Sequence, residues 1–221
     1  MDRPLASLGI LGGTFNPPHL GHLELARHAR DELDLLRVVL MPAHIAPHKS
    51  AEQDPGVEHR LAMSRLLVGG EEGLSVCGLE LERPGASYTV DTLERIHASE
   101  PDSELTFIVG ADIARTLPAW REPARVLELA RLAIAERDGT SSEEVLETIA
   151  ALRSGGERSG NVATRGDLEV SFLRMPVIEV SSSSVRGRVE RGEAVDQLVG
   201  PRVARYIAEH GLYRSGAGGN G

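Results

Sequence analysis

Apolar and polar positions along the chain follow two alternating patterns. Short apolar runs indicate buried strands. Between them lie longer stretches in which apolar residues recur every three or four positions, as on one face of a helix. The runs predict strands at residues 8–13, 38–41, 74–81, 105–109, 132–135 and 170–173. The periodic stretches predict helices at residues 19–29, 57–68, 89–97, 142–152, 182–191 and 201–210.

This order of strands and helices predicts the fold class. Repeated strand–helix units give a parallel sheet with helices on both faces, so we expect an α/β protein with a Rossmann-like, doubly wound sheet. A single domain with C-terminal helices is expected over residues 1–214, with a Gly/Ser/Arg-rich loop at residues 154–166 and a disordered tail at residues 215–221. Such sheets bind ligands at the carboxyl ends of their strands, where the turns after residue 12 and at Gly110 fall.

Composition and charge narrow the class of protein. The chain has 221 residues, of which 41% are hydrophobic, so it can bury a full core. No stretch approaches the ~18 consecutive apolar residues of a membrane span, and the start of the chain lacks the features of a secretory signal. The net charge of −9 argues against a nucleic-acid partner, which needs a basic face. The single cysteine, Cys77, excludes an internal disulfide and suits the reducing cytoplasm, while homo-oligomerisation stays open.

The turn after the first predicted strand is the most informative segment of the chain. Residues 12–22 read GGTFNPPHLGH, and a helix begins near the first histidine. Glycine backbone lets a phosphate approach closely, and a helix N-terminus favours anions because its first amides lack partners. His19 and His22 lie three positions apart and therefore on one face of the first turn. A metal site is the alternative, but no further ligands stand nearby at a suitable spacing.

A second candidate segment, residues 180–186, reads VSSSSVR. Serines after a strand are good helix N-caps, and their amides and hydroxyls can converge on an anion. We expect Arg186 in the first helical turn, where a cation is unfavourable unless an anion offsets it. A serine-rich cap with a solvated arginine would explain this segment if it stood alone. Its occurrence together with residues 12–22 favours a binding role.

Lysine usage singles out one further position. The 24 basic residues are 23 arginines and one lysine, Lys49, in the sequence Pro47-His48-Lys49. A lysine is a compact point charge on a flexible stem, which suits contact with a phosphate. A stray surface lysine is the alternative.

Taken together, the two segments resemble the signatures of the nucleotidyltransferase superfamily. In that superfamily a His-x-Gly-His sequence binds the triphosphate of ATP or CTP, and adenylyltransferases add Ile-Ser-Ser-x-x-Ile-Arg. Val180 and Val185 replace the two isoleucines here. Pro47-His48-Lys49, Ser87-Tyr88-Thr89, Pro118-Ala119-Trp120 and the closing residues 211–214 resemble the bacterial nicotinate-nucleotide adenylyltransferase family, over residues 7–214.

The resemblance implies transfer of AMP from ATP to nicotinate mononucleotide, giving deamido-NAD and pyrophosphate. It assigns the catalytic roles to His19, His22, Lys49 and Arg186. The ATP-binding residues are then Gly12, Gly13, Thr14, Phe15, Gly21, Gly110, Asp112, Ser182 and Ser183. The residues that bind nicotinate mononucleotide are Tyr88, Thr89, Trp120 and Arg121, with the tryptophan stacked on the ring and backbone amides on its carboxylate.

No protein-held metal is expected, because no carboxylate cluster forms a metal cage. Mg²⁺ is expected to travel with the ATP phosphates and to keep several waters. Asp112 is expected to contact either the nucleotide ribose or a hydrated metal ion. Two departures from the family stand out: Ala46 where a proline is frequent, and Arg121 where an aromatic residue usually follows the tryptophan.

Other members of the superfamily are the nearest alternatives. Pantetheine-phosphate adenylyltransferase, the cytidylyltransferases and FAD synthetase share His-x-Gly-His but should lack the three shorter motifs. A relative that prefers nicotinamide is the closest of them. A synthetase-like RNA-binding module is excluded, because a chain with one lysine cannot form the lysine-rich second motif of class I synthetases. A non-catalytic ligand sensor stays open.

Overall fold

The computed structural model describes residues 6–43, 53–79, 88–136, 142–153, 170–174 and 179–214. They contain a six-stranded sheet in the order β3-β2-β1-β4-β5-β6, with every neighbouring pair parallel. The strands are β1 (Ala6–Gly13), β2 (Arg37–Pro42), β3 (Leu74–Val76), β4 (Ser103–Gly110), β5 (Arg131–Glu136) and β6 (Val170–Arg174). This arrangement is the predicted doubly wound sheet, and its strand order reverses between β1 and β4.

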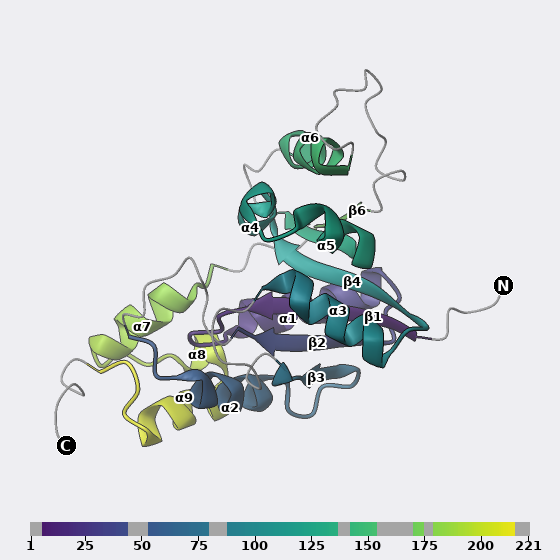
Figure 1. Ribbon diagram of the computed structural model, residues 1–221. Helices are drawn as coiled ribbons and strands as arrows, with labels where there is room; N and C mark the ends of the chain where they lie inside the picture. Colours follow the sequence, from purple (N-terminus) through teal and green to yellow (C-terminus); the bar gives the residue numbers. More distant parts are fainter. Residues whose placement is uncertain are drawn as a thin grey trace.

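Helices cover both faces of the sheet. Two apolar clusters, one on each face, hold them there. The first face carries α1 (Leu20–Glu32), α2 (Val57–Val68), α7 (Ser182–Glu190), α8 (Asp196–Val199) and α9 (Pro201–Glu209). The second carries α3 (Thr89–Ser99), α4 (Ala111–Ala114), a 3₁₀ helix (Leu117–Ala119), α5 (Pro123–Leu129) and α6 (Ser142–Arg153). Figure 1 shows α4, α5 and α6 at the top of the molecule and α2, α7 and α9 at its lower left.

Strand β4 shows why the apolar runs are continuous. Leu105, Phe107 and Val109 pack into the cluster of the second face, while Ile108 packs into that of the first. Successive side chains of a strand point to opposite faces, so a strand covered on both sides is apolar at nearly every position, and Thr106 is the buried polar exception in β4. The core is therefore split by the sheet into two layers.

The structure corrects several predicted boundaries. A strand was expected over residues 74–81, but β3 ends at Val76. It lies at the edge of the sheet, and its last hydrogen bond to β2 runs from the N–H of Cys77 to the carbonyl of Leu40. Gly78, which weakens a strand, follows directly. The sequence patterns also missed α4, α5, α8 and the 3₁₀ helix, which are too short to show a period. The predicted loop at residues 154–166 and the tail at residues 215–221 lie outside the described residues.

The register of the central strands sets where a ligand can bind. Leu11 and Ile108 are the last paired residues of β1 and β4, and each strand runs on for two more residues, to Gly13 and Gly110. Both strands thus end in glycine at the point where the strand order reverses. A Cβ added at Gly110 would meet nothing within 4 Å. Among the described residues, nothing packs against the position of a Gly110 side chain at the carboxyl end of β4.

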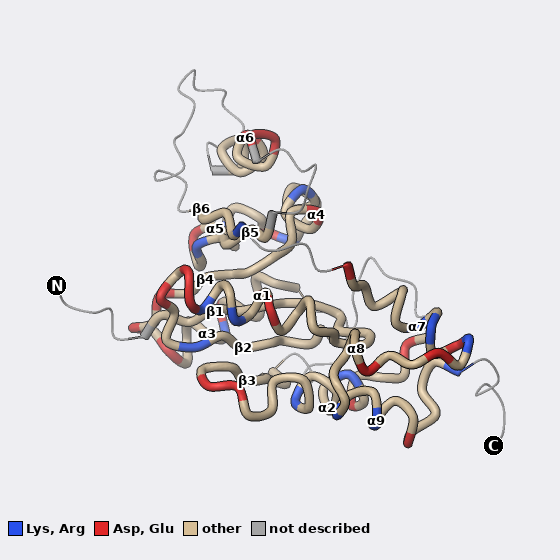
Figure 2. Tube along the Cα trace, turned by 180° about the vertical axis from the view of Figure 1, so that it is seen from behind, with Lys and Arg blue, Asp and Glu red and all other residues tan. Residues whose placement is uncertain are grey.

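Two properties concern the molecule as a whole, its helix lengths and its distribution of charge. No helix in the described ranges has the length and apolar character that crossing a membrane requires. Figure 2 shows basic and acidic positions interspersed along α7 and its neighbours, although the whole chain carries a net charge of −9.

Candidate active site

The turn between β1 and α1 is anchored in the core by Phe15. Its side chain is only 2% exposed, and its backbone has a φ of 51°. A Cβ on Gly13 would lie 3.0 Å from the Phe15 ring, inside the 3.5–4.0 Å of a normal carbon contact. Glycine at position 13 thus lets the aromatic ring fold back under the turn. The backbone of residues 13–15 is left at the carboxyl end of β1.

His19 and His22 form one unit at the start of α1. The rings stack with centroids 3.6 Å apart and an interplanar angle of 22°, and the backbone N–H of His19 donates to Nδ1 of His22 at 3.2 Å. The ring of Phe15 meets that of His22 edge-on at 4.8 Å. The prediction that both imidazoles share one face is confirmed. A Cβ on Gly21 would lie 3.1 Å from Nδ1 of His19, so only glycine leaves the pair undisturbed.

Helix α7 packs directly against this turn. Ser181 caps the helix by accepting a hydrogen bond from the N–H of Ser184 at 3.1 Å, as the serine run predicts. The hydroxyl of Ser182 donates to the carbonyl of Pro17 at 2.9 Å, across 165 residues of sequence. The two signature segments therefore form one site.

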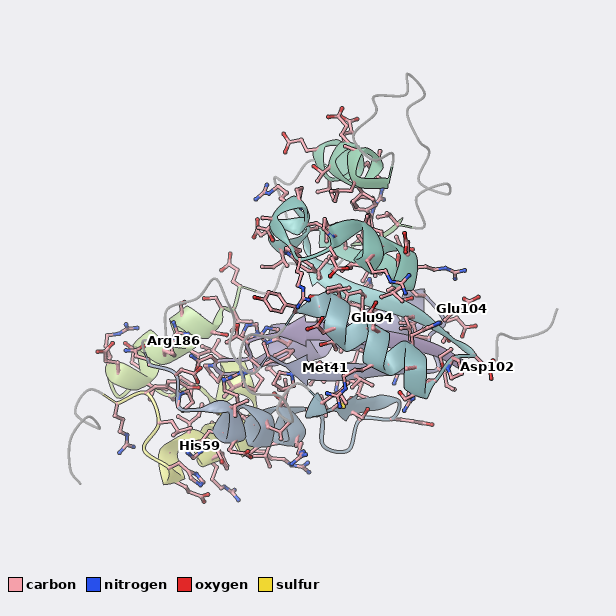
Figure 3. The ribbon with its side chains drawn as sticks, viewed as in Figure 1. Met41, His59, Glu94, Asp102, Glu104 and Arg186 are labelled. Carbon is pink, nitrogen blue, oxygen red and sulfur yellow. The ribbon has the colours of Figure 1, made fainter. Side chains whose placement is uncertain are left out.

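Arg186 reaches back from α7 to the turn. It is the fifth residue of the helix, so it begins the second turn and not the first as expected, because one turn takes about 3.6 residues. Its Nη1 donates to the carbonyl of Asn16 at 2.7 Å, its Nε to Oε1 of Gln53 at 3.1 Å, and its Nη2 to Oγ of Ser183 at 3.3 Å. Figure 3 labels Arg186 on α7.

Arg60 was not predicted as a site residue, and it is only 1% exposed in α2. Its Nη1 donates to the carbonyls of Thr14 at 2.8 Å and Ala43 at 2.7 Å, and its Nε pairs with Oδ1 of Asp54 at 3.1 Å. This guanidinium ties the end of β1 to the end of β2. Its helical spacing from Ser64 and Leu67 places Arg60 on the buried face of α2, and an arginine on that face could have been predicted to need buried partners.

The end of the chain closes over the same turn. Tyr213 is 7% exposed and donates its phenol hydrogen to Oδ1 of Asn16 at 2.8 Å. Burial raises the pKa of the Tyr213 phenol well above its usual range, and the carboxylate of Asp54 adds to the rise. The positive charges of Arg186 and Arg60 act in the opposite direction.

A second group of predicted residues gathers where α3 begins. The guanidinium of Arg121 lies 5.1 Å from the centroid of the Tyr88 ring and donates to Oδ2 of Asp91 at 3.4 Å. Thr89 is the first residue of α3, so its amide belongs to those that lack an intrahelical acceptor. The indole N–H of Trp120 donates to Oγ1 of Thr116 at 2.9 Å. Tyr88, Thr89 and Arg121 are thus close together, as predicted.

Phe107 connects this group to the first one. Its ring lies 3.2 Å from the Cβ position that a side chain at Gly12 would occupy, and it meets the Trp120 ring edge-on at 5.8 Å. Gly12 and Trp120 therefore flank the same buried ring. Phe107 was missed as a site residue because it stands inside the apolar run of β4, where any large side chain is expected.

The remaining predicted residues are placed less centrally or not described. Asp112 is exposed and pairs with Arg115 at 2.7 Å, so no contact within the described chain distinguishes a ribose role from a metal role. Lys49, with Pro47 and His48, lies outside the described residues, as does Ser87. Among the residues the structure describes, no three His, Cys, Asp or Glu side chains form a metal-binding group.

Comparisons with known proteins identify the family. Residues 10–188 match the cytidylyltransferase-like family model. The chain is 38% identical over 211 residues to the probable nicotinate-nucleotide adenylyltransferase of Thermomicrobium roseum, covering 96% of this chain and 93% of that protein. It is 39% identical to the protein of the same name from Gemmatimonas aurantiaca, covering 94% and 92% respectively.

A solved structure shares the fold. The nicotinic acid mononucleotide adenylyltransferase of Plasmodium falciparum, complexed with NaAD, superimposes with a TM-score of 0.72 at 17% identity. The match covers 94% of this chain and 97% of that one. Such low identity supports the fold alone, whereas the bacterial relatives are similar over nearly their whole length. The chain therefore belongs to the nicotinate-nucleotide adenylyltransferases, within the cytidylyltransferase-like family.

Proposed function

We propose that the protein transfers AMP from ATP to nicotinate mononucleotide, with deamido-NAD and pyrophosphate as products. The observation that carries this proposal is the joining of the two signature segments, in which Ser182 and Arg186 of α7 bond to the backbone of Pro17 and Asn16. Histidines, a guanidinium and two helix N-termini are thereby gathered at one turn. The charge of Arg186, the hydrogen-bonding imidazoles and the partial positive charge of the helix N-termini suit a polyphosphate.

At the ATP end, each group has a role that follows from its place. The imidazoles of His19 and His22, with the guanidinium of Arg186, stabilise charge on the triphosphate and on the departing pyrophosphate. Backbone and small side chains cradle the phosphates and nucleoside at Gly12, Gly13, Thr14, Phe15, Gly21, Gly110, Asp112, Ser182 and Ser183. Lys49 adds a compact positive charge to the same phosphates.

At the acceptor end, Trp120 stacks on the nicotinate ring. The amides of Thr89 and Arg121 hold the ring carboxylate, which the N-terminus of α3 also favours. The guanidinium of Arg121 lies on the Tyr88 ring near that N-terminus, and its charge is paired with Asp91 and Glu122. Arg121 thus replaces the usual aromatic residue without removing the backbone contact.

The chemistry needs alignment more than acid–base catalysis. A phosphate monoester has a second pKa of about 6, so the mononucleotide phosphate is mostly dianionic at neutral pH. One of its oxygens attacks the α-phosphorus of ATP in line, a new P–O bond forms, and the bond to the β-phosphate bridging oxygen breaks. The electron pair leaves with pyrophosphate. No covalent enzyme intermediate is required.

Mg²⁺ enters with the ATP phosphates. The described residues offer no all-protein cage, and Mg²⁺ usually keeps several waters when it is bound through phosphates. We further propose that residues 1–214 form the functional domain and that the protein acts in the cytoplasm, which a single cysteine suits.

A panel assay tests the proposal. Pyrophosphate release is measured with ATP and a series of phosphorylated acceptors: nicotinate mononucleotide, nicotinamide mononucleotide, phosphopantetheine, FMN and glycerol phosphate. The highest catalytic efficiency is expected with nicotinate mononucleotide. Preference for another acceptor would reject the assignment, and a thermal shift with ATP but no release with any acceptor would indicate a ligand sensor.

A further inference from the structure

Two arginines meet the same short turn but receive different partners. The turn consists of Gln53 and Asp54. The Nε of Arg60 lies 3.1 Å from the carboxylate Oδ1 of Asp54, and the Nε of Arg186 lies 3.1 Å from the amide Oε1 of Gln53. Two neighbouring residues thus offer one neutral acceptor, the amide of Gln53, and one charged acceptor, the carboxylate of Asp54.

Burial explains the charged acceptor. The side chain of Arg60 is 1% exposed, and a buried charge is costly unless an opposite charge accompanies it. Asp54 supplies that charge, and its Oδ1 also accepts from the N–H of Gly56 at 2.9 Å. The Arg60–Asp54 pair is therefore a structural ion pair, in which the charge of Arg60 is neutralised by a protein carboxylate.

Arg186 has the opposite arrangement. All three of its acceptors are neutral: the carbonyl of Asn16, the amide oxygen of Gln53 and the hydroxyl of Ser183. Within the described part of the chain, Arg186 forms no ion pair with a carboxylate. Neutral acceptors fix the plane of a guanidinium by hydrogen bonds but leave its net charge available to an external anion.

We infer that Gln53 is a positioning residue for the phosphate-binding site, which aims Arg186 while leaving its positive charge uncompensated. The inference rests on the proposed function, since it takes the ATP phosphates as the anion that Arg186 meets. What matters for function is that the side chain at position 53 carries no charge, so that it does not compete with the phosphates for Arg186. Gln53 also holds the turn itself, because its carbonyl accepts from Nδ2 of Asn16 at 3.4 Å.

Substitutions at position 53 separate two properties of Gln53, its orientation of the Arg186 guanidinium and its lack of charge. Gln53→Glu keeps the shape and strengthens the hydrogen bond to Arg186, but it adds a carboxylate that competes with phosphate. Gln53→Ala removes the acceptor without adding charge. We expect the KM for ATP and the inhibition constant for pyrophosphate to rise about tenfold in Gln53→Glu, equivalent to ~1.4 kcal/mol, and by less in Gln53→Ala. The KM for nicotinate mononucleotide should change less than twofold in both.

Salt and a control variant sharpen the comparison. The excess effect of Gln53→Glu over Gln53→Ala should shrink between low and high ionic strength, because added salt screens exposed charges. Gln197→Glu makes the same change of net charge on α8, where Gln197 bonds to Asp196, and should leave the KM for ATP unaltered. A merely structural role would predict the reverse order, with alanine more harmful than the similarly shaped glutamate.

Asp54→Asn provides the reciprocal test. Removing the carboxylate leaves Arg60 buried beside a neutral group, so the melting temperature should fall. At a temperature where the variant is folded, its KM for ATP should stay within about twofold of wild type. Gln53→Glu should show the opposite pair of effects, an unchanged or higher melting temperature and a weakened affinity for ATP.

The outcomes distinguish this inference from the proposed function. The role of Gln53 would be overturned if the KM for ATP were no higher in Gln53→Glu than in Gln53→Ala while Arg186→Ala is severely impaired. An Asp54→Asn variant that weakens ATP use without losing stability would overturn it too. Full activity of Arg186→Ala would instead reject the assignment of Arg186 to the phosphates.

Discussion

The phenol of Tyr213 donates a hydrogen bond to Oδ1 of Asn16 at 2.8 Å, across 197 residues of sequence. Asn16 lies in the turn after β1, and its carbonyl accepts from Arg186. One asparagine thus joins the end of the chain, helix α7 and the nucleotide-binding turn. Its side chain is 9% exposed, so its polar atoms depend on these protein partners.

Removing the phenol should therefore destabilise the protein. Tyr213→Phe leaves a buried acceptor on Asn16 without its donor, at a cost of about 1–3 kcal/mol. Denaturant unfolding measures the loss. Tyr206→Phe is the matched control, because Tyr206 bonds to His59 at a half-exposed position and should cost less. Equal stability of Tyr213→Phe and wild type would show that the hydrogen bond contributes nothing.

The same residue predicts a stability change in alkali. Burial raises the pKa of Tyr213 in the folded protein above its ordinary value of 10.0. The unfolded chain then releases this proton at a lower pH than the folded chain, so stability falls as pH rises above about 10. The loss should be smaller in Tyr213→Phe. Parallel pH profiles for the two proteins would contradict the assignment.

His22 should be required for turnover and not for folding. His22→Ala removes one charge stabiliser at the start of α1, and such losses cost about 10²–10³-fold in rate. Turnover should fall by ~10²-fold or more, with an unchanged circular dichroism spectrum. His28→Ala, on the same helix and paired with Glu32 at the surface, should retain activity. Near-normal turnover of His22→Ala would remove this residue from the mechanism.

Arg186 should act on ATP and not on the acceptor. Arg186→Ala should raise the KM for ATP and lower kcat, while the KM for nicotinate mononucleotide stays close to wild type. Arg186→Lys should rescue poorly, because a lysine cannot make the paired contacts of a planar guanidinium. Arg188→Ala is the control, since Arg188 is exposed on the same helix.

Replacing Gly21 even by alanine should impair the protein. In Gly21→Ala the new Cβ would lie 3.1 Å from both Nδ1 of His19 and Cγ1 of Val180, so the histidine pair must shift. We expect turnover to fall with a modest loss of stability. Gly187→Ala, inside α7, meets only the flexible Arg191 side chain and should be stabilising by about 0.5–1 kcal/mol. Unchanged turnover in Gly21→Ala would show that the close packing is unimportant.

Acid should be preferred over amide at the acceptor site. An amide offered to paired N–H donors turns its own NH₂ toward one of them and leaves a buried donor unsatisfied, at roughly 1–3 kcal/mol. Nicotinate mononucleotide should therefore be used at least about tenfold more efficiently than nicotinamide mononucleotide. Trp120→Ala should impair both, because stacking does not depend on the substituent. Equal efficiency would favour the nicotinamide-specific alternative.

Local patterns predicted the parts of the fold that span several turns or fully buried strands. Helix α2 begins and ends at the predicted residues, Val57 and Val68, because glycines stand on either side of it. Helices α4 and α8 have four residues each, and no period can be detected over so few positions. Tertiary contacts hold them where local propensity gives no signal.

The site divides in the same way. His19, His22, Ser182 and Arg186 stand in motifs, so the sequence identified them, and the structure brings them together. Arg60 and Gln53 stand in no motif. Their importance comes from partners far away in sequence, such as Thr14 for Arg60 and Arg186 for Gln53. A pattern confined to neighbouring positions cannot contain that information.

The long-range contacts of Asn16 and Pro17 also set when the protein becomes active during its synthesis. A nascent chain that has reached β5 already holds the five strands β1 to β5, including the glycine-ended pair at the centre of the sheet. It still lacks Ser182, Arg186 and Tyr213, which close the nucleotide-binding turn. The ribosome thus releases the final helices only after the sheet can form. A chain that ends before α7 lacks the groups that close the phosphate site, and it also lacks the apolar side chains with which α7, α8 and α9 cover one face of the sheet.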